Sequence, residues 1–467
     1  MVGIFWVSVL ACAVLGGAFA SMAQRRFGNA GRGPATAFAV TGPAVMMVSG
    51  MYPFLAGSAF AVLTLVAAQR CSRLGFALAA TATVCFSPLA FLVLVLCLLA
   101  AVVEQHRPLA VLTANRVQAV FLVLLVGLAA VWARLFSSQG YYAYGGTDLV
   151  VIAVFSGLGL YLCGLREERS TLRAFFAVYL VANVLAFALS TPVGSNAARV
   201  FSIAGMPLLW MASRVGNHPR HRVVVAAILV AALSLQMTPV VIDAYAEAHD
   251  PAAAPSYWRP VIGFLDRHPS QAYRVEVVAT WGHWEAYYLA TRGIPLARGW
   301  YRQNDYPQNQ VLYRGDELTA RAYRAWLRTM GVRYVFLPGT RLDYSAVAEA
   351  SLLRSGLSGL TELWHSRNWT LYQLPHPRAM LTPPAGDHAR LLGITPAAVR
   401  MWLSDAGVYT LRVHYSPYWR VPAGACVGAT ADGMTAIRTL VAGPLTLHMD
   451  PSPDSLGDAL LGPGSSC

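Results

Sequence analysis

The sequence contains no lysine, and charged residues of all kinds make up only 12% of it, about half of the roughly 25% typical of a soluble domain. Acidic residues number 22 against 35 basic ones, and none occurs before Glu104. Apolar runs fill residues 1–240, whereas charged and aromatic residues recur regularly afterwards. This pattern excludes a wholly soluble protein and predicts an α-helical membrane domain followed by a water-exposed part.

Arginine supplies the whole basic charge, and the formal net charge is +13. A charge of this size indicates nucleic-acid binding when it gathers in one stripe or tail. Here the arginines are spread over short connections between apolar runs, where membrane topology explains them. We therefore expect no nucleic-acid partner.

About ten apolar segments are predicted to be membrane helices, near residues 4–20, 35–50, 53–68, 75–86, 88–103, 117–135, 148–164, 173–190, 198–214 and 222–239. Arginine gathers in every second connection, at Arg25, Arg26, Arg32, Arg70, Arg73, Arg107, Arg116, Arg166, Arg169, Arg173, Arg214, Arg220 and Arg222. The alternate connections hold only Arg134 and Arg199. Because arginine accumulates in cytoplasmic loops, we expect a multi-pass plasma-membrane protein, in contact with membrane lipids, whose residues after 240 are extracytoplasmic.

Two features of this layout are irregular. Ser87 and Pro88 interrupt the segments 75–86 and 88–103, which are short enough to form a re-entrant hairpin or two short, tilted helices. The segment 4–20 lacks the basic residues that precede the apolar core of a signal peptide. An outward N-terminus without a preceding helix is possible but less usual, so the sequence leaves open whether an upstream part of the protein is absent from this chain.

Five of the seven cysteines fall in or beside apolar segments, where cysteine behaves as a small hydrophobic residue. Cys426 and Cys467 fall in the extracytoplasmic part, where an oxidising compartment permits a disulfide. Two interpretations stay open, a bridge between them and two free thiols, and we favour the bridge. No CxxC motif or other metal-ligand spacing occurs, so no metal site is predicted.

The water-exposed part begins with a predicted α/β domain over residues 251–375. Short apolar runs at 273–280 and 333–338 indicate buried strands, and two further runs joined at Arg367-Asn368 indicate a hairpin. Between the strands, amphipathic patterns predict helices.

Two of these helices are predicted to end at Gly331 and Gly356. Beyond residue 375 the pattern changes to short strand-like runs separated by Gly, Pro and Asp. We expect a small all-β, sandwich-like module over residues 376–467.

Longer stretches of the chain carry a resemblance to a known superfamily. They are "GMYPFLAGSAFAVLTLVAAQR", "CFSPLAFLVLVLCLLAAV", "STPVGSNAARVFSIAGMPLLW", "WGHWEAYYLATRGIPLARGWYRQNDY", "YRAWLRTMGVRYVFLP" and "YSPYWRV". Together they resemble uncharacterised actinobacterial multi-pass membrane proteins, which look like relatives of the glycosyltransferase C (GT-C) superfamily. Members of that superfamily take sugar from a polyprenyl-phosphate donor at the outer face of the membrane. The resemblance implies a GT-C-like glycosyltransferase of envelope glycan assembly, with a polyprenyl-phosphate sugar, a glycan acceptor and a divalent cation as ligands.

One feature of that superfamily is missing here. Its enzymes carry a catalytic Asp or Glu in the first outer loop, whereas the first acid of this chain is Glu104, on the predicted cytoplasmic side. Three alternatives stay open: a missing N-terminal portion carries the carboxylate, this chain is not an active enzyme alone, or a later acid substitutes. Asp148 is the acid at an outer membrane boundary, and we favour a charge stabilised by the helix dipole over a catalytic role for it.

The outer loop "STPVGSNAARVF" places Asn196 and Arg199 near the outer leaflet. An arginine there can bind a lipid phosphate through paired hydrogen bonds. It can equally anchor the protein by reaching toward the headgroups. Both interpretations stay open.

The stretch from Trp281 to Tyr306 holds the remaining candidates. His283 and Glu285 are predicted to point in different directions from a helix, and Trp281, Trp284 and Tyr288 to form one aromatic packing stripe on it. The loop that follows carries further polar residues that suit contact with a sugar or a lipid phosphate, namely Arg298, Arg302 and Asp305.

Docking onto the membrane helices is an equally good interpretation of that loop. The sequence thus leaves two functions open: a glycosyltransferase, or a non-catalytic envelope protein that binds lipid or glycan or scaffolds a partner protein. A transporter is disfavoured, because no inverted repeat or mid-membrane series of charges occurs.

Overall fold

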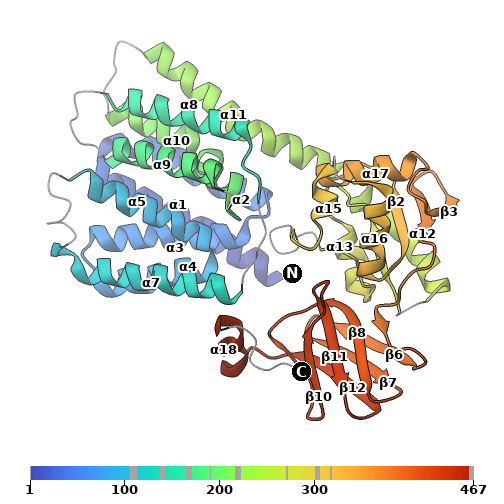
Figure 1. Cartoon of the computed structure of the whole chain (residues 1–467). Coiled ribbons are helices and arrows are strands. Elements are labelled where there is room, and N and C mark those ends of the chain that lie inside the picture. Colours follow the sequence, from blue (N-terminus) through green and yellow to red (C-terminus); the bar gives the residue numbers. More distant parts are fainter. Residues whose placement is uncertain are drawn as a thin grey trace. The chain divides into compact units, whose positions relative to one another are not determined.

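The computed structural model describes residues 2–105, 113–136, 142–164, 171–189, 191–215, 222–269, 272–299, 306–315 and 318–461. The chain separates into two compact units (Figure 1). The helical unit comprises residues 1–133 and 141–246, and the C-terminal unit comprises residues 134–140 and 247–467.

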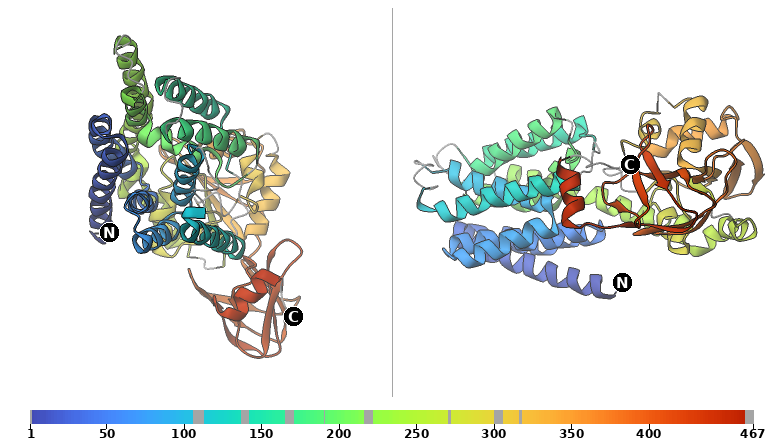
Figure 2. Two further views of the ribbon diagram at one scale, coloured as in Figure 1. Left: turned by 90° about the vertical axis from the view of Figure 1, so that its left-hand side faces the viewer. Right: turned by 60° about the horizontal axis from the view of Figure 1, so that its bottom comes forward.

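The helical unit consists of helices that lie side by side (Figure 2). They are α1 (Val2–Phe27), α2 (Asn29–Val48), α3 (Tyr52–Gln69), α4 (Arg73–Phe86), α5 (Pro88–Val103), α7 (Arg116–Leu135), α8 (Gly146–Leu162), α9 (Thr171–Ala188), α10 (Arg199–Val215) and α11 (Arg222–Ala248). A helix therefore occupies each apolar segment that the sequence indicated.

The prediction of about ten membrane spans is not supported. Within the described residues, five helices are long and apolar enough to cross a membrane, namely α1, α3, α7, α9 and α11. Helices α4, α5 and α8 have 14, 16 and 17 residues. At 1.5 Å per residue each is shorter than the roughly 30 Å of a bilayer core. An apolar run alone does not distinguish a spanning helix from a shorter helix or from one packed inside a bundle, because all three are apolar.

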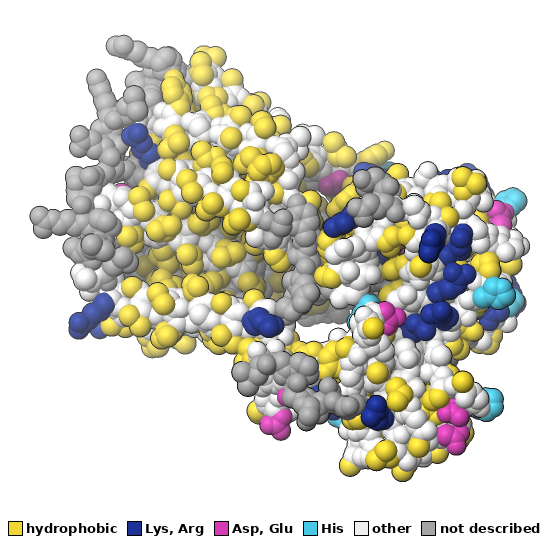
Figure 3. Space-filling model, viewed as in Figure 1, with side chains coloured by type: hydrophobic (Ala, Val, Ile, Leu, Met, Phe, Trp, Pro, Cys, Tyr) yellow, Lys and Arg dark blue, Asp and Glu magenta, His cyan; other side chains and the backbone are white. Residues whose placement is uncertain are grey.

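Helix α10 illustrates such internal packing. It contains Pro207 and ten buried residues, and at Gly33 a Cβ would lie 3.0 Å from the ring of Trp210. Helix α7 is the opposite case. Leu125 is its only buried residue, while Leu124 and Trp132 are 65% and 60% exposed. Figure 3 shows hydrophobic side chains covering the visible face of this unit. Exposing so large an apolar surface to water is unfavourable, whereas contact with lipid is not. These helices are therefore those of a membrane protein.

The irregular region near Ser87 forms two separate helices, α4 and α5. The Ser87 hydroxyl accepts a hydrogen bond from the backbone N–H of Ala90, 3.2 Å away, and so caps the start of α5. Pro88 follows at the first position of that helix, where its missing N–H is harmless.

In the C-terminal unit, one sheet has the strand order β1 (Arg274–Val277), β2 (Val332–Pro338), β4 (Trp369–Gln373), β3 (Thr361–His365). Strands β1 and β2 are parallel, and the other neighbours are antiparallel. The two predicted buried strands and the hairpin are thus confirmed.

Alternate residues of β2 pack on opposite faces of this sheet. Tyr334 and Phe336 belong to a core shared with α12 (Pro255–Arg267), whereas Val335 and Leu337 face α16 (Ala320–Met330) and α17 (Val347–Arg354). Gly331 ends α16 with a left-handed backbone, as the sequence predicted. Helix α12 was not predicted.

The chain then forms two further four-stranded sheets. One has the order β10 (Ala425–Ala429), β11 (Met434–Thr439), β8 (Gly407–His414), β5 (Leu381–Thr382), and the other β6 (Ala389–Thr395), β7 (Ala398–Leu403), β12 (Gly443–Met449), β9 (Trp419–Arg420). Both contribute to one apolar core, for example Met401 from one sheet and Leu411 from the other. This is the expected sandwich. A short helix, α18 (Pro453–Leu461), follows. Cys467 lies outside the described residues, so its bridge to Cys426 stays a prediction.

Candidate functional site

The helical unit contains an apolar cavity of about 470 Å³, walled by α1, α2, α3, α5, α9 and α10. Along α3 its lining extends from Phe54 to Gln69. Fifteen residues of helix correspond to ~22 Å, so the cavity is elongated along the helix axes. Small side chains of α3 and α5 line it, including Ser58, Ala61 and Ala101. Its length and apolar lining suit a hydrocarbon chain.

Polar side chains gather at one end of this cavity, and we call them the Arg26 cluster (Arg26, Gln69, Glu104, Gln105 and Thr171). They lie at the C-terminal ends of α1, α3 and α5 and at the start of α9. The Arg26 guanidinium forms an ion pair with Glu104 and donates to the Thr171 hydroxyl from Nε at 2.9 Å.

The two charged side chains of the Arg26 cluster differ in exposure. Arg26 is 44% exposed, whereas Glu104 is 9% exposed. The guanidinium can therefore bind a second anion while keeping its carboxylate partner. Sequence reasoning used Arg26 only as a topology marker. One sequence feature could have indicated the Arg26–Glu104 pair: Glu104, the first acid of the chain, lies at the end of an apolar run.

The candidate residues Asp148, Asn196 and Arg199 lie in another part of the helical unit. Asp148 is in the first turn of α8 and accepts a hydrogen bond from the Ser195 hydroxyl, 2.5 Å away. This supports the favoured role of Asp148 at a helix N-terminus. Asn196 lies in the turn that precedes α10. The guanidinium carbon of Arg199 is 5.5 Å from the centre of the Phe54 ring, and Phe54 lines the end of the cavity opposite Gln69.

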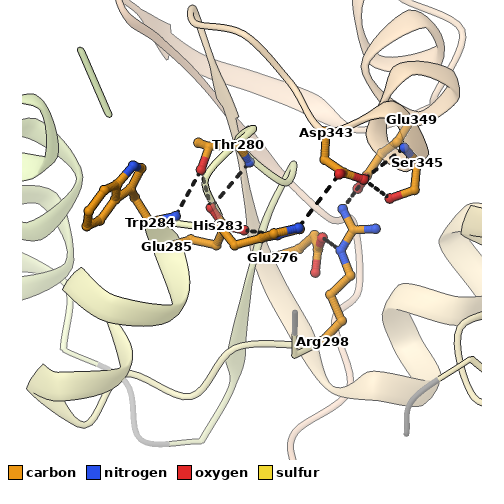
Figure 4. A network of polar contacts seen from close by, with 9 residues as sticks. All are labelled: Glu276, Thr280, His283, Trp284, Glu285, Arg298, Asp343, Ser345 and Glu349. Carbon is orange, nitrogen blue, oxygen red and sulfur yellow. Dashed lines mark hydrogen bonds and ion pairs between the residues drawn. The ribbon is translucent and has the colours of Figure 1, made fainter. Parts of the chain in front are cut away.

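A second polar site lies in the C-terminal unit, beyond the carboxyl ends of the parallel strands β1 and β2, where ligand sites of α/β sheets commonly occur. Figure 4 shows His283 pointing toward two carboxylates. Its Nδ1 is 3.2 Å from Glu285 Oε1, and its Nε2 is 3.7 Å from Asp343 Oδ2. Glu285 Oε2 also accepts from the Thr280 hydroxyl at 2.7 Å.

The prediction that His283 and Glu285 point apart was wrong. Helix α13 (Glu285–Tyr288) begins only at Glu285, and His283 precedes it with a left-handed backbone, φ 52°. This conformation turns the imidazole back onto the carboxylate. Trp284 and Tyr288 do pack into the core against α12, but Trp281 does not continue the stripe. Instead, the Arg341 guanidinium lies 3.5 Å from the centre of the Trp281 ring.

Arg298 points into the fold and bonds to two acids from different elements (Figure 4). Its Nε is 2.9 Å from Glu276 on β1, and its Nη2 is 2.6 Å from Glu349 on α17. The three side chains are 6%, 1% and 0% exposed. The Tyr323 hydroxyl donates to the other Glu349 oxygen at 2.6 Å.

Electrostatics keep this buried group ionised. Burial alone would lower the pKa of Arg298, but the carboxylates of Glu276 and Glu349 outweigh it and raise the pKa. Burial, followed by the charge of Glu349, raises the pKa of Tyr323 well above its usual value. Arg298 therefore joins β1 to α17 through two buried ion pairs, and its Nε and Nη2 are both used by carboxylates. The other two candidates of this loop, Arg302 and Asp305, lie outside the described residues.

No group of three or more His, Cys, Asp or Glu side chains could hold a metal ion in the part of the chain that the structure describes. Neither the known family models nor the curated proteins include one that matches this chain. The likeness to GT-C enzymes thus remains an expectation from the sequence.

Proposed function

We propose that this chain is a membrane protein that binds one long-chain anionic lipid in the cavity of its helical unit, with the apolar chain between α3 and α5. The observation that carries the proposal is the elongated apolar cavity with the Arg26 cluster at one end. Apolar lining suits a hydrocarbon chain, and the half-exposed guanidinium of Arg26 suits a phosphate.

The lipid class that we propose is a polyprenyl-phosphate sugar, as the resemblance to GT-C proteins implies. The chain would then use this lipid as a glycosyl donor at the outer membrane face in envelope glycan assembly. The alternative is a non-catalytic envelope protein that binds the lipid or scaffolds a partner. We also propose, from the arginine distribution, that the Arg26 cluster faces the cytoplasm and the C-terminal unit the exterior.

The end of the cavity that holds the phosphate distinguishes these alternatives. A headgroup beside Arg26 would lie on the proposed cytoplasmic side, away from an outer-face acceptor. A headgroup beside Arg199, near Phe54, would lie where an outer-face transferase needs it. Arg26 lines the cavity itself, whereas Arg199 is not among its lining residues and lies against the ring of Phe54, which is. This difference supports Arg26 and the non-catalytic alternative.

Photocrosslinking of the full-length protein in lipid nanodiscs tests lipid binding. The probe is a polyprenyl phosphate that carries a benzophenone at the end of its chain. Ala61→Phe fills the cavity from α3, where Ala61 is buried. Ala130→Phe adds the same ring to an exposed position of α7. We expect crosslinking to fall about tenfold in A61F and to be unchanged in A130F. Equal crosslinking of both variants would refute binding in this cavity.

Two neutral variants then locate the phosphate. Loss of a charge-assisted hydrogen bond costs about 1.5–3 kcal/mol, so Arg26→Gln should weaken binding of the phosphate probe at least tenfold and leave binding of an unphosphorylated polyprenol unchanged. If Arg199→Gln has this effect instead, the transferase is favoured. Transfer of labelled sugar from a polyprenyl-phosphate sugar to an envelope glycan would establish it.

A further inference from the structure

Helix α11 carries the chain from the membrane into the C-terminal unit. Residues 223–242 of this helix contain no charged side chain and span ~30 Å, the thickness of a bilayer core. The helix extends to Ala248, and its residues from Glu247 onward belong to the C-terminal unit. Glu247 lies ~8 Å along the axis beyond Ile242. This is the level of the lipid headgroups, which occupy about 5–8 Å on each side of the core.

Two loops of the C-terminal unit gather around this end of α11. A Cβ at Gly282, in the loop after β1, would lie 2.4 Å from the carboxylate of Glu247, which is itself partly buried. The Thr340 hydroxyl, in the loop after β2, donates to Asp250 at 3.0 Å. The carboxyl ends of the parallel strands β1 and β2 therefore lie close to the level of the headgroups.

The end of a second membrane helix, α7, contacts the same unit at Tyr418. Leu135 is the last residue of α7, and residues 134–140 belong to the C-terminal unit. The Tyr418 hydroxyl donates to the Leu135 carbonyl at 2.6 Å, and the Phe136 and Tyr418 rings stack with their centres 5.4 Å apart. The C-terminal unit is thus fixed to the ends of two membrane helices, so one of its faces lies along the bilayer surface.

Trp281 and Arg341 form a stacked pair in the two loops that surround the end of α11. The Arg341 guanidinium carbon is 3.5 Å from the centre of the Trp281 ring, and the Trp281 N–H donates to the Arg341 carbonyl at 3.0 Å. Arg341 is exposed, and among the described residues no carboxylate pairs with its side chain. Stacking occupies the flat face of a guanidinium, whereas a phosphate binds at its N–H edge. Tryptophan and arginine are also side chains that anchor proteins at the headgroup level.

Two buried acids follow this pair in the chain and bond within the fold (Figure 4). Glu285 accepts from the Thr280 hydroxyl at 2.7 Å, and Asp343 accepts from the Ser345 hydroxyl at 2.5 Å. The side chains of Glu285 and Asp343 are 9% and 7% exposed. They therefore do not compete with a lipid phosphate for Arg341.

We propose that the loops after β1 and β2 rest on the headgroups of the bilayer that α11 crosses, and that Arg341 binds the phosphate of a phospholipid there. The Trp281 ring supports the guanidinium on its flat face, so that the N–H edge meets the phosphate. This contact brings the polar site around His283 to the membrane surface. It involves the C-terminal unit and does not depend on lipid binding in the cavity of the helical unit.

Headgroup crosslinking in nanodiscs tests this contact. The full-length protein is reconstituted with phosphatidylglycerol that carries a diazirine on its headgroup, illuminated and digested with trypsin. The peptide of residues 275–292 contains Trp281, and the peptide of residues 401–412 contains Trp402. We expect the Trp281 peptide to carry at least fivefold more label than the Trp402 peptide.

Trp402 is the matched control, because it is 40% exposed and pairs across the sheet with the exposed Arg390. It also pairs with Pro444 of β12, whereas β9, which follows Tyr418, pairs with His448 of the same strand. Pro444 and His448 are ~13 Å apart along β12. The control pair is therefore separate from both points at which the membrane helices end.

Two neutral variants then test the arginine. Arg341→Gln removes the charge-assisted contact with the phosphate and should lower the labelling of residues 275–292 at least threefold. Arg390→Gln should leave this labelling unchanged. Both arginines are exposed, so both variants should keep the fold.

Equal labelling of the Trp281 and Trp402 peptides in the wild type would overturn the proposal. It is also overturned if residues 275–292 are labelled to the same extent in R341Q and R390Q. Ala61→Phe, which fills the lipid cavity, should leave this labelling unchanged, so the two proposals can fail separately.

Discussion

Replacing Arg298 by methionine removes the positive charge that Glu276 and Glu349 share in the C-terminal unit. Methionine keeps much of the side-chain length, so the cavity that it leaves is small. The two carboxylates, 1% and 0% exposed, would then lie in the protein interior close to each other without a cation. The Tyr323 hydroxyl would still donate its hydrogen bond to Glu349.

The expected loss of stability follows from the burial of Glu276 and Glu349, which keep their charges without Arg298. Removing one partner of a buried ion pair costs about 3–5 kcal/mol, because the remaining charge stays desolvated. For a unit of this size, each kcal/mol lowers the unfolding temperature by about 2–4 °C. We therefore expect R298M to lower the unfolding temperature of the C-terminal unit by about 10 °C at pH 7.5.

The loss of stability in R298M should increase as the pH rises. In the variant, desolvation and mutual repulsion raise the folded-state pKa of at least one carboxylate above the unfolded value of about 4.3. The folded variant then binds more protons than the unfolded chain, so its stability falls as the pH rises through the raised pKa. The difference from wild type should be smaller at pH 5 than at pH 8.

Thermal unfolding of the detergent-solubilised protein, followed by tryptophan fluorescence between pH 5 and pH 8, measures both effects. Arg292→Met is the control, because Arg292 is an exposed arginine of the same unit. The reasoning is refuted if R298M unfolds at the same temperature as R292M. It is also refuted if the loss of stability in R298M does not change with pH, because the ion pairs of Arg298 with Glu276 and Glu349 would then not stabilise the unit.

Three further substitutions test local features by thermal unfolding. Gly194→Ala should lower the unfolding temperature of the helical unit by several degrees, because at φ 45° a Cβ would lie 2.0 Å from the Tyr142 carbonyl oxygen; Gly157→Ala, with open space around it, should not. Asp148→Asn should cost about 1 kcal/mol through the weaker helix-end charge and hydrogen bond to Ser195, and a larger loss would indicate a further role. His283→Asn should be tolerated better than His283→Ala, because asparagine accepts a left-handed backbone more readily; equal losses would show that the backbone of His283 is unstrained.

Much of the C-terminal unit could be predicted from local pattern. The strands around Val277 and Phe336 are short apolar runs bounded by turn residues, and Gly331 supplies the left-handed backbone that ends α16. Helix α12 was missed because Pro255 and Pro260 lie in it. Both are within its first turns, where a missing N–H breaks few internal hydrogen bonds.

The candidate sites were only partly predictable. The sequence singles out the stretch after Trp281 by its charged and aromatic residues. The polar contacts of this stretch, however, involve Asp343 and Glu349, which are about fifty to sixty residues further along the chain. No local pattern indicates that Arg298 would turn inward to Glu349 while His283 turns toward Asp343.

The sequence by itself determined the division into an apolar helical part and a globular part, since composition alone decides which segments prefer lipid to water. It also determined most helix and strand positions, because their periodicity and ending residues are local. Only the tertiary structure decided which apolar helices are buried inside the bundle, since that depends on neighbours such as Trp210 beside Gly33. It alone also brought Arg26 to Glu104 and Arg298 to Glu349, because these contacts join elements that are far apart in the chain.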